Sequence, residues 1–85
     1  MKAKTVTTTI KIANRLGRDH SVVLEPLGEQ FVLPAGTTMA ISTEVSIKTE
    51  LEIDVREDRL SLWMLDGPDY DKTLAVTVDG KRMTR

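Results

Sequence analysis

One stretch of the sequence constrains the fold more than any other. From Met39 to Val55 the odd positions read Met, Ile, Thr, Val, Ile, Thr, Leu, Ile, Val, and the even positions from Ser42 to Arg56 are all polar or charged. A two-residue period is that of a β-strand with one buried face, and the same residues would scatter around a helix. The stretch therefore predicts β-structure and argues against a helix over 44–56.

This alternating stretch is too long for a single straight strand. At about 3.3 Å per residue it would extend over more than roughly 50 Å, whereas a compact chain of this size has a radius of gyration of about 12 Å. The strand is therefore expected to bend or break, at Ser42-Thr43-Glu44 or at Lys48-Thr49-Glu50. A strand that turns such a corner passes from one sheet to another, as in a sandwich or barrel.

Shorter alternating segments occupy most of the remaining chain, and turn residues separate them. The segments are Val6 to Ile12, Val22 to Leu24, Gln30 to Leu33, Leu60 to Met64, Leu74 to Val78 and Lys81 to Met83, with Asp79-Gly80 as the strongest hairpin signal. This pattern predicts an all-β fold of about eight short, mainly antiparallel strands. We expect a β-sandwich or jelly-roll-like barrel, with residues 1–85 as a single all-β domain.

Composition points to self-association. The chain has 85 residues, no Cys and one His. A chain this short buries only about 60 to 65 % of the surface of its unfolded form, and small domains usually add disulfides, a metal or a partner subunit. Disulfides are excluded and a zinc cage is unsupported. A homo-oligomer is therefore expected, with a dimer favoured.

The charge balance restricts the partners further. Twelve Lys and Arg residues face 13 Asp and Glu residues, so no net field would attract nucleic acid or an anionic membrane. The first residues, 1–9, contain no apolar run typical of a signal peptide, and no segment is apolar enough to span a membrane. The expectation is a cytoplasmic protein that binds neither nucleic acid nor membrane.

The candidate catalytic residues do not assemble into a site. His20 is the single His, and Ser21 beside it would point to the opposite face of a strand, so the two form no nucleophile and base pair. Glu50, Glu52 and Asp54 share one face but lie between Lys48 and Arg56, as on a solvated surface. We therefore predict no catalytic, cofactor-binding or metal-binding residues, no cofactor and no enzymatic activity.

Trp63 marks a candidate interaction surface. Leu60, Leu62 and Met64 occupy one face of its strand, so Trp63 falls on the other face with Leu65. It is buried there by a second layer of the fold or serves as an interface anchor, a role in which Trp is enriched. With Tyr70 in the following loop, Trp63 and Leu65 form the predicted interaction surface.

The segment from Leu24 to Gly36, LEPLGEQFVLPAG, supplies two resemblances. It resembles small, uncharacterised bacterial all-β proteins that carry an LEPxGExFxLPxG-like segment, which implies an all-β fold and names no activity. Gly28, Pro34 and Gly36 are also similar to the second cupin motif. Met39 and Thr43 stand where that motif has its metal-binding His and its Asn, so the resemblance implies a jelly-roll turn without the metal chemistry.

Two functions follow as expectations. The first is a non-enzymatic β-sandwich module for protein–protein interaction or self-association, with an unidentified protein partner or a second copy. The alternative is a small-molecule binding module of degenerate, metal-free cupin type, with a ligand pocket lined by Phe31, Met39 and Ile41. An interaction module leaves apolar surface exposed after folding, whereas a ligand module encloses a cavity.

Overall fold

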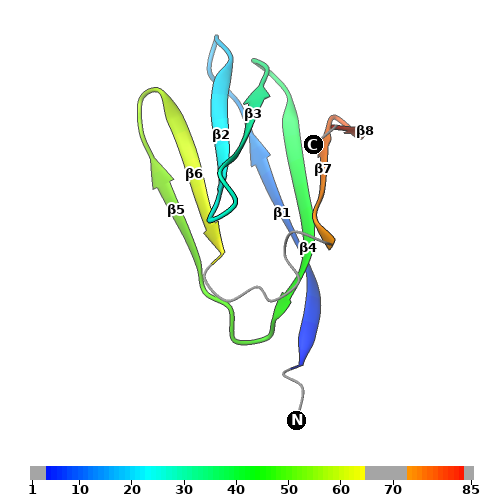
Figure 1. Cartoon of the computed structure of the whole chain (residues 1–85). Coiled ribbons are helices and arrows are strands. Elements are labelled where there is room, and N and C mark those ends of the chain that lie inside the picture. Colours follow the sequence, from blue (N-terminus) through cyan, green and yellow to red (C-terminus); the bar gives the residue numbers. More distant parts are fainter. Residues whose placement is uncertain (1–3, 65–72, 84–85) are drawn as a thin grey trace.

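The computed structural model describes residues 4–64 and 73–83, and these residues form eight β-strands. The strands, shown in Figure 1, are β1 (Thr5–Ala13), β2 (His20–Glu25), β3 (Glu29–Leu33), β4 (Thr38–Ser46), β5 (Leu51–Val55), β6 (Arg59–Met64), β7 (Ala75–Val78) and β8 (Lys81–Arg82). The predicted all-β fold of eight short strands is confirmed.

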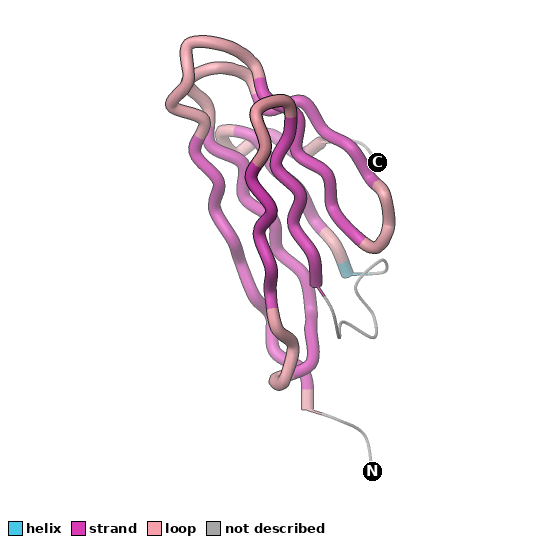
Figure 2. The backbone as a smooth tube through the Cα atoms, turned by 90° about the vertical axis from the view of Figure 1, so that its left-hand side faces the viewer, coloured by secondary structure: helices cyan, strands magenta, loops and turns pink. Residues whose placement is uncertain are grey.

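The strands form two four-stranded sheets, which are not closed into a barrel. One sheet has the order β1-β4-β7-β8 and the other the order β3-β2-β6-β5. Every pairing within them is antiparallel except that of β2 with β6. Figure 2 shows the strands running roughly along the long axis of the molecule. In the part of the chain that is described, no helix is long and apolar enough to cross a membrane.

The long alternating stretch breaks at the second of its two predicted positions. β4 runs without a break through 42–44 to Ser46, so the prediction of a break at the first position was wrong. There the hydroxyl of Thr43 is buried within hydrogen-bond distance of the Thr73 hydroxyl, at 3.0 Å, so a polar side chain is accommodated without a break. After Ser46 a turn closed by the Thr49 N–H carries the chain to β5 in the other sheet. The corner between two sheets is confirmed.

The core lies between the sheets and is built from the inward positions of their central strands. Met39 and Ile41 of β4 pack with Leu24 of β2 and Leu62 of β6, all with no exposed surface. Their alternation follows from the pleat of a strand, which turns every second side chain inward. Among residues 4–64 and 73–83 the buried apolar residues are Val22, Leu24, Phe31, Leu33, Met39, Ile41, Val45, Leu62, Met64, Leu74 and Val76.

The β7–β8 hairpin turns at Asp79 and Gly80, as predicted from the dipeptide. Both residues have positive φ, 49° and 81°, and the Asp79 side chain accepts a hydrogen bond from the Thr38 N–H at 2.9 Å. Positive φ costs an L-residue roughly 1 to 2 kcal/mol, a cost that glycine escapes.

Gly80→Ala is expected to lower the free energy of unfolding by about 1 kcal/mol, because alanine would adopt positive φ in the folded state. In thermal unfolding this corresponds to a fall in Tm of about 5 °C. Gly17→Ala is the control, because Gly17 is exposed, has no positive φ and has open space where the alanine Cβ would lie. Equal losses for the two variants would contradict the turn geometry.

Candidate functional site

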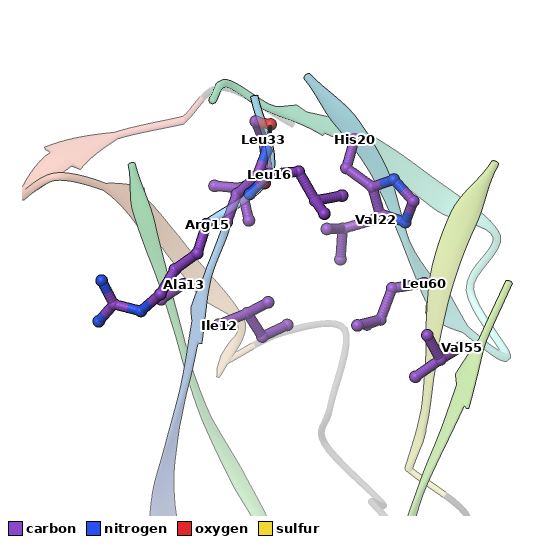
Figure 3. A pocket seen from close by; sticks show the side chains of 10 residues that line it. Ile12, Ala13, Arg15, Leu16, His20, Val22, Leu33, Val55 and Leu60 are labelled. Carbon is purple, nitrogen blue, oxygen red and sulfur yellow. Dashed lines mark hydrogen bonds between the residues drawn. The ribbon is translucent and has the colours of Figure 1, made fainter. Parts of the chain in front are cut away.

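Two strands, β1 and β5, each lie at the end of their own sheet, and Ile12 of β1 and Val55 of β5 reach into the same pocket from opposite sides (Figure 3). β1 pairs with β4 alone, and β5 pairs with β6 alone, among the residues that the structure describes. Each therefore leaves one row of backbone N–H and C=O groups without a strand partner in residues 4–64 and 73–83. Such edges are templates for the addition of another strand.

The inner faces of these two edge strands are apolar but poorly covered. Val6 of β1 is 42 % exposed, and in β5 the exposed fractions are 42 % for Leu51, 52 % for Ile53 and 71 % for Val55. Their cross-strand neighbours Val45, Met64 and Leu62 are buried. We call the inner faces of β1 and β5, with Val6, Leu51, Ile53 and Val55 as their four exposed apolar residues, the open edge. Here the two sheets leave these four side chains partly uncovered, whereas Ile10 and Ile12 of β1 pack against the core.

A pocket of about 390 Å³ forms at one end of the open edge (Figure 3). Ile12 reaches it from β1, whereas Leu60 and Val55 reach it from β6 and β5, and Leu16 of the β1–β2 loop extends over it. A neighbouring hollow shares Leu16, Val55 and His20 with this pocket. The residues that line the pocket of about 390 Å³ are Ile12, Ala13, Asn14, Arg15, Leu16, His20, Val22, Leu33, Val55 and Leu60.

Few polar groups of the pocket are available to a ligand. The Asn14 side chain is engaged on both ends, since its Nδ2 donates to the Arg18 and Leu33 carbonyls and its Oδ1 accepts from the Leu16 N–H, all at 2.9 Å. The Arg15 guanidinium points away from the pocket, while the His20 ring lies at its rim (Figure 3). The pocket offers mainly apolar contact.

The comparisons with known proteins add no family. No family model matches this chain, and neither a curated protein nor a solved structure matches it.

The structure separates the residues that were considered for catalysis. His20 lines the pocket between the sheets, whereas the Ser21 Oγ lies 3.4 Å from the Gln30 Nε2, which donates to it. Glu52 and Asp54 are the register neighbours of Trp63 and Ser61 in β6. They lie on the outer face of that sheet, whereas His20 lies on its inner face. Among residues 4–64 and 73–83, no three His, Cys, Asp or Glu side chains are grouped so as to hold a metal ion.

Trp63 lies outside the core cluster and is half-buried, on the strand face opposite Leu62 and Met64. Its neighbours in register are Glu25 of β2 and Glu52 of β5. The other two residues of the predicted interaction surface, Leu65 and Tyr70, lie outside the described residues. For this surface the structure therefore describes Trp63 alone.

The residues predicted to line a ligand pocket are in the packed core. Phe31 is 6 % exposed, and Met39 and Ile41 have no exposed surface. Met39 and Ile41 lie on β4, inside its sheet, and Phe31 lies on the edge strand β3. All three belong to the core cluster, and none of them lines the pocket at the open edge. The physical reason is the pleat of the strands, which turns these side chains inward, where they pack in the core cluster.

The open edge itself was missed by sequence reasoning. Ile53 and Val55 have the same alternation as the buried residues of β4, which signals an inward face but not whether another sheet covers it. The information that decides exposure is the strand order, and short-range patterns do not contain it.

Proposed function

We propose that the protein is a non-enzymatic β-sandwich module that works by protein–protein association at its open edge, with self-association as the first mode to test. One observation carries the proposal: four apolar side chains, Val6, Leu51, Ile53 and Val55, are 42 to 71 % exposed on the inner faces of two edge strands. Contiguous apolar surface of this kind is typical of interaction sites.

Physical chemistry favours a protein as the occupant. An added strand or a second sandwich satisfies the backbone groups of an edge and covers its apolar face in one step. Burial of apolar surface contributes about 25 cal/mol per Å², and backbone pairing adds the directionality. A small ligand would contact the apolar residues but would leave the strand edges unpaired.

The proposal predicts association that depends on the open edge. Light scattering across a concentration series should show the mass of the wild-type chain rise from one copy to two. Ile53→Lys should keep it at one copy, because the partner would have to bury an ammonium group against apolar residues. Val32→Lys is the matched control, since Val32 is also 52 % exposed but lies on β3, the opposite edge strand of the same sheet.

Two outcomes would contradict this function. In the first, the wild-type chain stays a single copy up to about 500 µM, a concentration that populates even weak dimers. In the second, Val32→Lys abolishes association and Ile53→Lys leaves it unchanged. The second outcome would transfer the interface to the outer face of the β3-β2-β6-β5 sheet.

A second candidate function has one observation in its favour, the apolar pocket of about 390 Å³ beneath Leu16. A small apolar molecule would fit a pocket of this size, as in a metal-free module of degenerate cupin type. This candidate predicts a single copy at every concentration and binding of a hydrophobic fluorophore. Because the pocket belongs to the open edge, a second copy and a ligand would compete for Val55.

A further inference from the structure

The two strands of the open edge carry opposite charge. From residue 4 to residue 13 the charged side chains are Lys4 and Lys11, with no acid between them. From residue 50 to residue 55 they are Glu50, Glu52 and Asp54, with no base between them. Asp54 contacts Arg56 at 3.2 Å in an exposed ion pair, whereas Lys11 and Glu52 make no ion pair with any described residue. Each strand is therefore complementary to the other and repels a copy of itself.

The two strands also run in the same direction (Figure 1). Ile12 and Ala13 end β1, Val55 ends β5, and all three line the same pocket, so the carboxyl ends of both strands lie at one end of the sandwich. Ile12 and Val55 are thus at similar heights along the strands. The strands belong to different sheets, and the pocket that Ile12 and Val55 line lies between them.

Two symmetric arrangements would join two open edges. A two-fold axis perpendicular to the sheets would pair β1 with β1 and β5 with β5, and would bring Glu52 and Asp54 against the same acids of the second copy. Like charges on neighbouring strands are destabilising. A two-fold axis parallel to the strands instead places β1 of each copy beside β5 of the other, and brings lysine to the acids twice.

We propose that two copies of this chain close each other's open edge, with β1 of each copy paired in parallel with β5 of the other. This inference rests on the proposed function and specifies its partner and its pairing. Each sheet of one copy continues into the opposite sheet of the second copy. The interface is isologous and closed, so the assembly ends at two copies.

The positions of the residues along the strand axis determine which residues of the two copies lie side by side. Rotation about an axis along the strands keeps each residue at its own height, so Ile12 meets the level of Val55 in the second copy. On the outer face, Lys11 then lies beside Asp54 and Glu52 of the second copy. On the inner face, Ile10 and Ile12 lie beside Ile53 and Val55 of the second copy, and their apolar surfaces join across the two sandwiches.

The size of the open edge sets the expected strength. A fully exposed Val, Leu or Ile side chain offers on the order of 100 Å² of apolar surface, and the four residues of the open edge are about half exposed. An apolar surface of this area is at the small end of the range for protein interfaces, where complexes are weak and transient. We expect a dissociation constant on the order of 10 µM, to which two strand pairings and two charge contacts contribute.

Charge reversal tests the pairing. Sedimentation equilibrium measures the dissociation constant of the wild-type chain, of Lys11→Glu, of Glu52→Lys with Asp54→Lys, and of all three substitutions in one chain. Reversal on one strand alone should weaken the dimer at least about tenfold, since every contact then joins like charges. The triple variant should regain a constant within about threefold of the wild type, because both contacts are again complementary.

Mixing the two partial variants should also restore a dimer of one copy of each. The control is Lys81→Glu on β8, an exposed residue at the far edge of the β1-β4-β7-β8 sheet, which should leave the constant unchanged. Partial variants that dimerise like the wild type, or a triple variant that stays monomeric, would overturn this pairing. The contrast between Ile53→Lys and Val32→Lys would still decide the proposed function separately.

Discussion

Replacement of Leu62 by alanine is expected to lower the free energy of unfolding by about 3 to 4 kcal/mol. Leu62 has no exposed surface and lies on the central strand β6, between Leu24 of β2 and Ile53 of β5. Truncation removes apolar contacts and leaves a cavity that two pleated sheets cannot collapse to fill. For a chain of this size, which has a total stability on the order of 5 to 10 kcal/mol, the loss is severe.

Ile53→Ala is the matched comparison, because Ile53 is directly opposite Leu62 on the same face of the same sheet. Ile53 is 52 % exposed, so its truncation in the monomer should cost about 1 to 2 kcal/mol. Urea unfolding followed by circular dichroism at low micromolar concentration measures both variants. Equal losses would mean that β5 is covered in the single chain, and that the open edge does not exist in solution.

The contrast between Leu62 and Ile53 also marks the limit of what sequence patterns predicted. The two-residue period assigned both residues to an inward face, and the register confirms it. The turn residues were equally informative, since Asp79-Gly80 and Pro34-Ala35-Gly36 mark places where the backbone itself reverses. Strand existence and phase depend on neighbours within a few residues, and a sequence displays those directly.

Strand order depends on residues that are far apart in the sequence, and the local patterns did not predict it. β2 lies beside β6, more than thirty residues away, and their parallel pairing has no local signal. The position of β5 at an edge follows from the same order. Ile53 is therefore half-exposed because of where β6 and β2 pair, and not because of any property of its own neighbourhood.

The candidate site was predicted less well than the fold for the same reason. Phe31, Met39 and Ile41 were expected to line a ligand pocket in a module of degenerate cupin type, but packing between two sheets buries them. Trp63 was correctly placed opposite Leu62 and Met64 by alternation. The apolar open edge combines β1 with β5, which are separated by nearly forty residues, so neither strand alone suggests it.

Asn14→Ala is expected to cost about 2 to 3 kcal/mol, although the residue is polar and lies at the end of an edge strand. Asn14 is buried, and its side chain joins the Arg18 and Leu33 carbonyls to the Leu16 N–H. Its backbone N–H donates to the Thr37 carbonyl. Alanine would leave the Leu33 carbonyl without its side-chain donor in a buried place, and such unsatisfied groups carry the full desolvation penalty.

Asp19→Ala tests whether an exposed contact of the β1–β2 loop contributes less to the free energy of unfolding than the buried contacts of Asn14. The Asp19 carboxylate also ties the β1–β2 loop to the β3–β4 turn, by accepting from the Ala35 N–H at 3.1 Å, but this contact is exposed. Its loss should cost less than about 1 kcal/mol, because water replaces the missing partner. Urea unfolding measures both variants, and amide hydrogen exchange at Leu16 should accelerate in Asn14→Ala alone. Similar losses for the two variants would mean that the loop above the pocket is held from its surface, and Leu16 would then not be a fixed wall of the open edge.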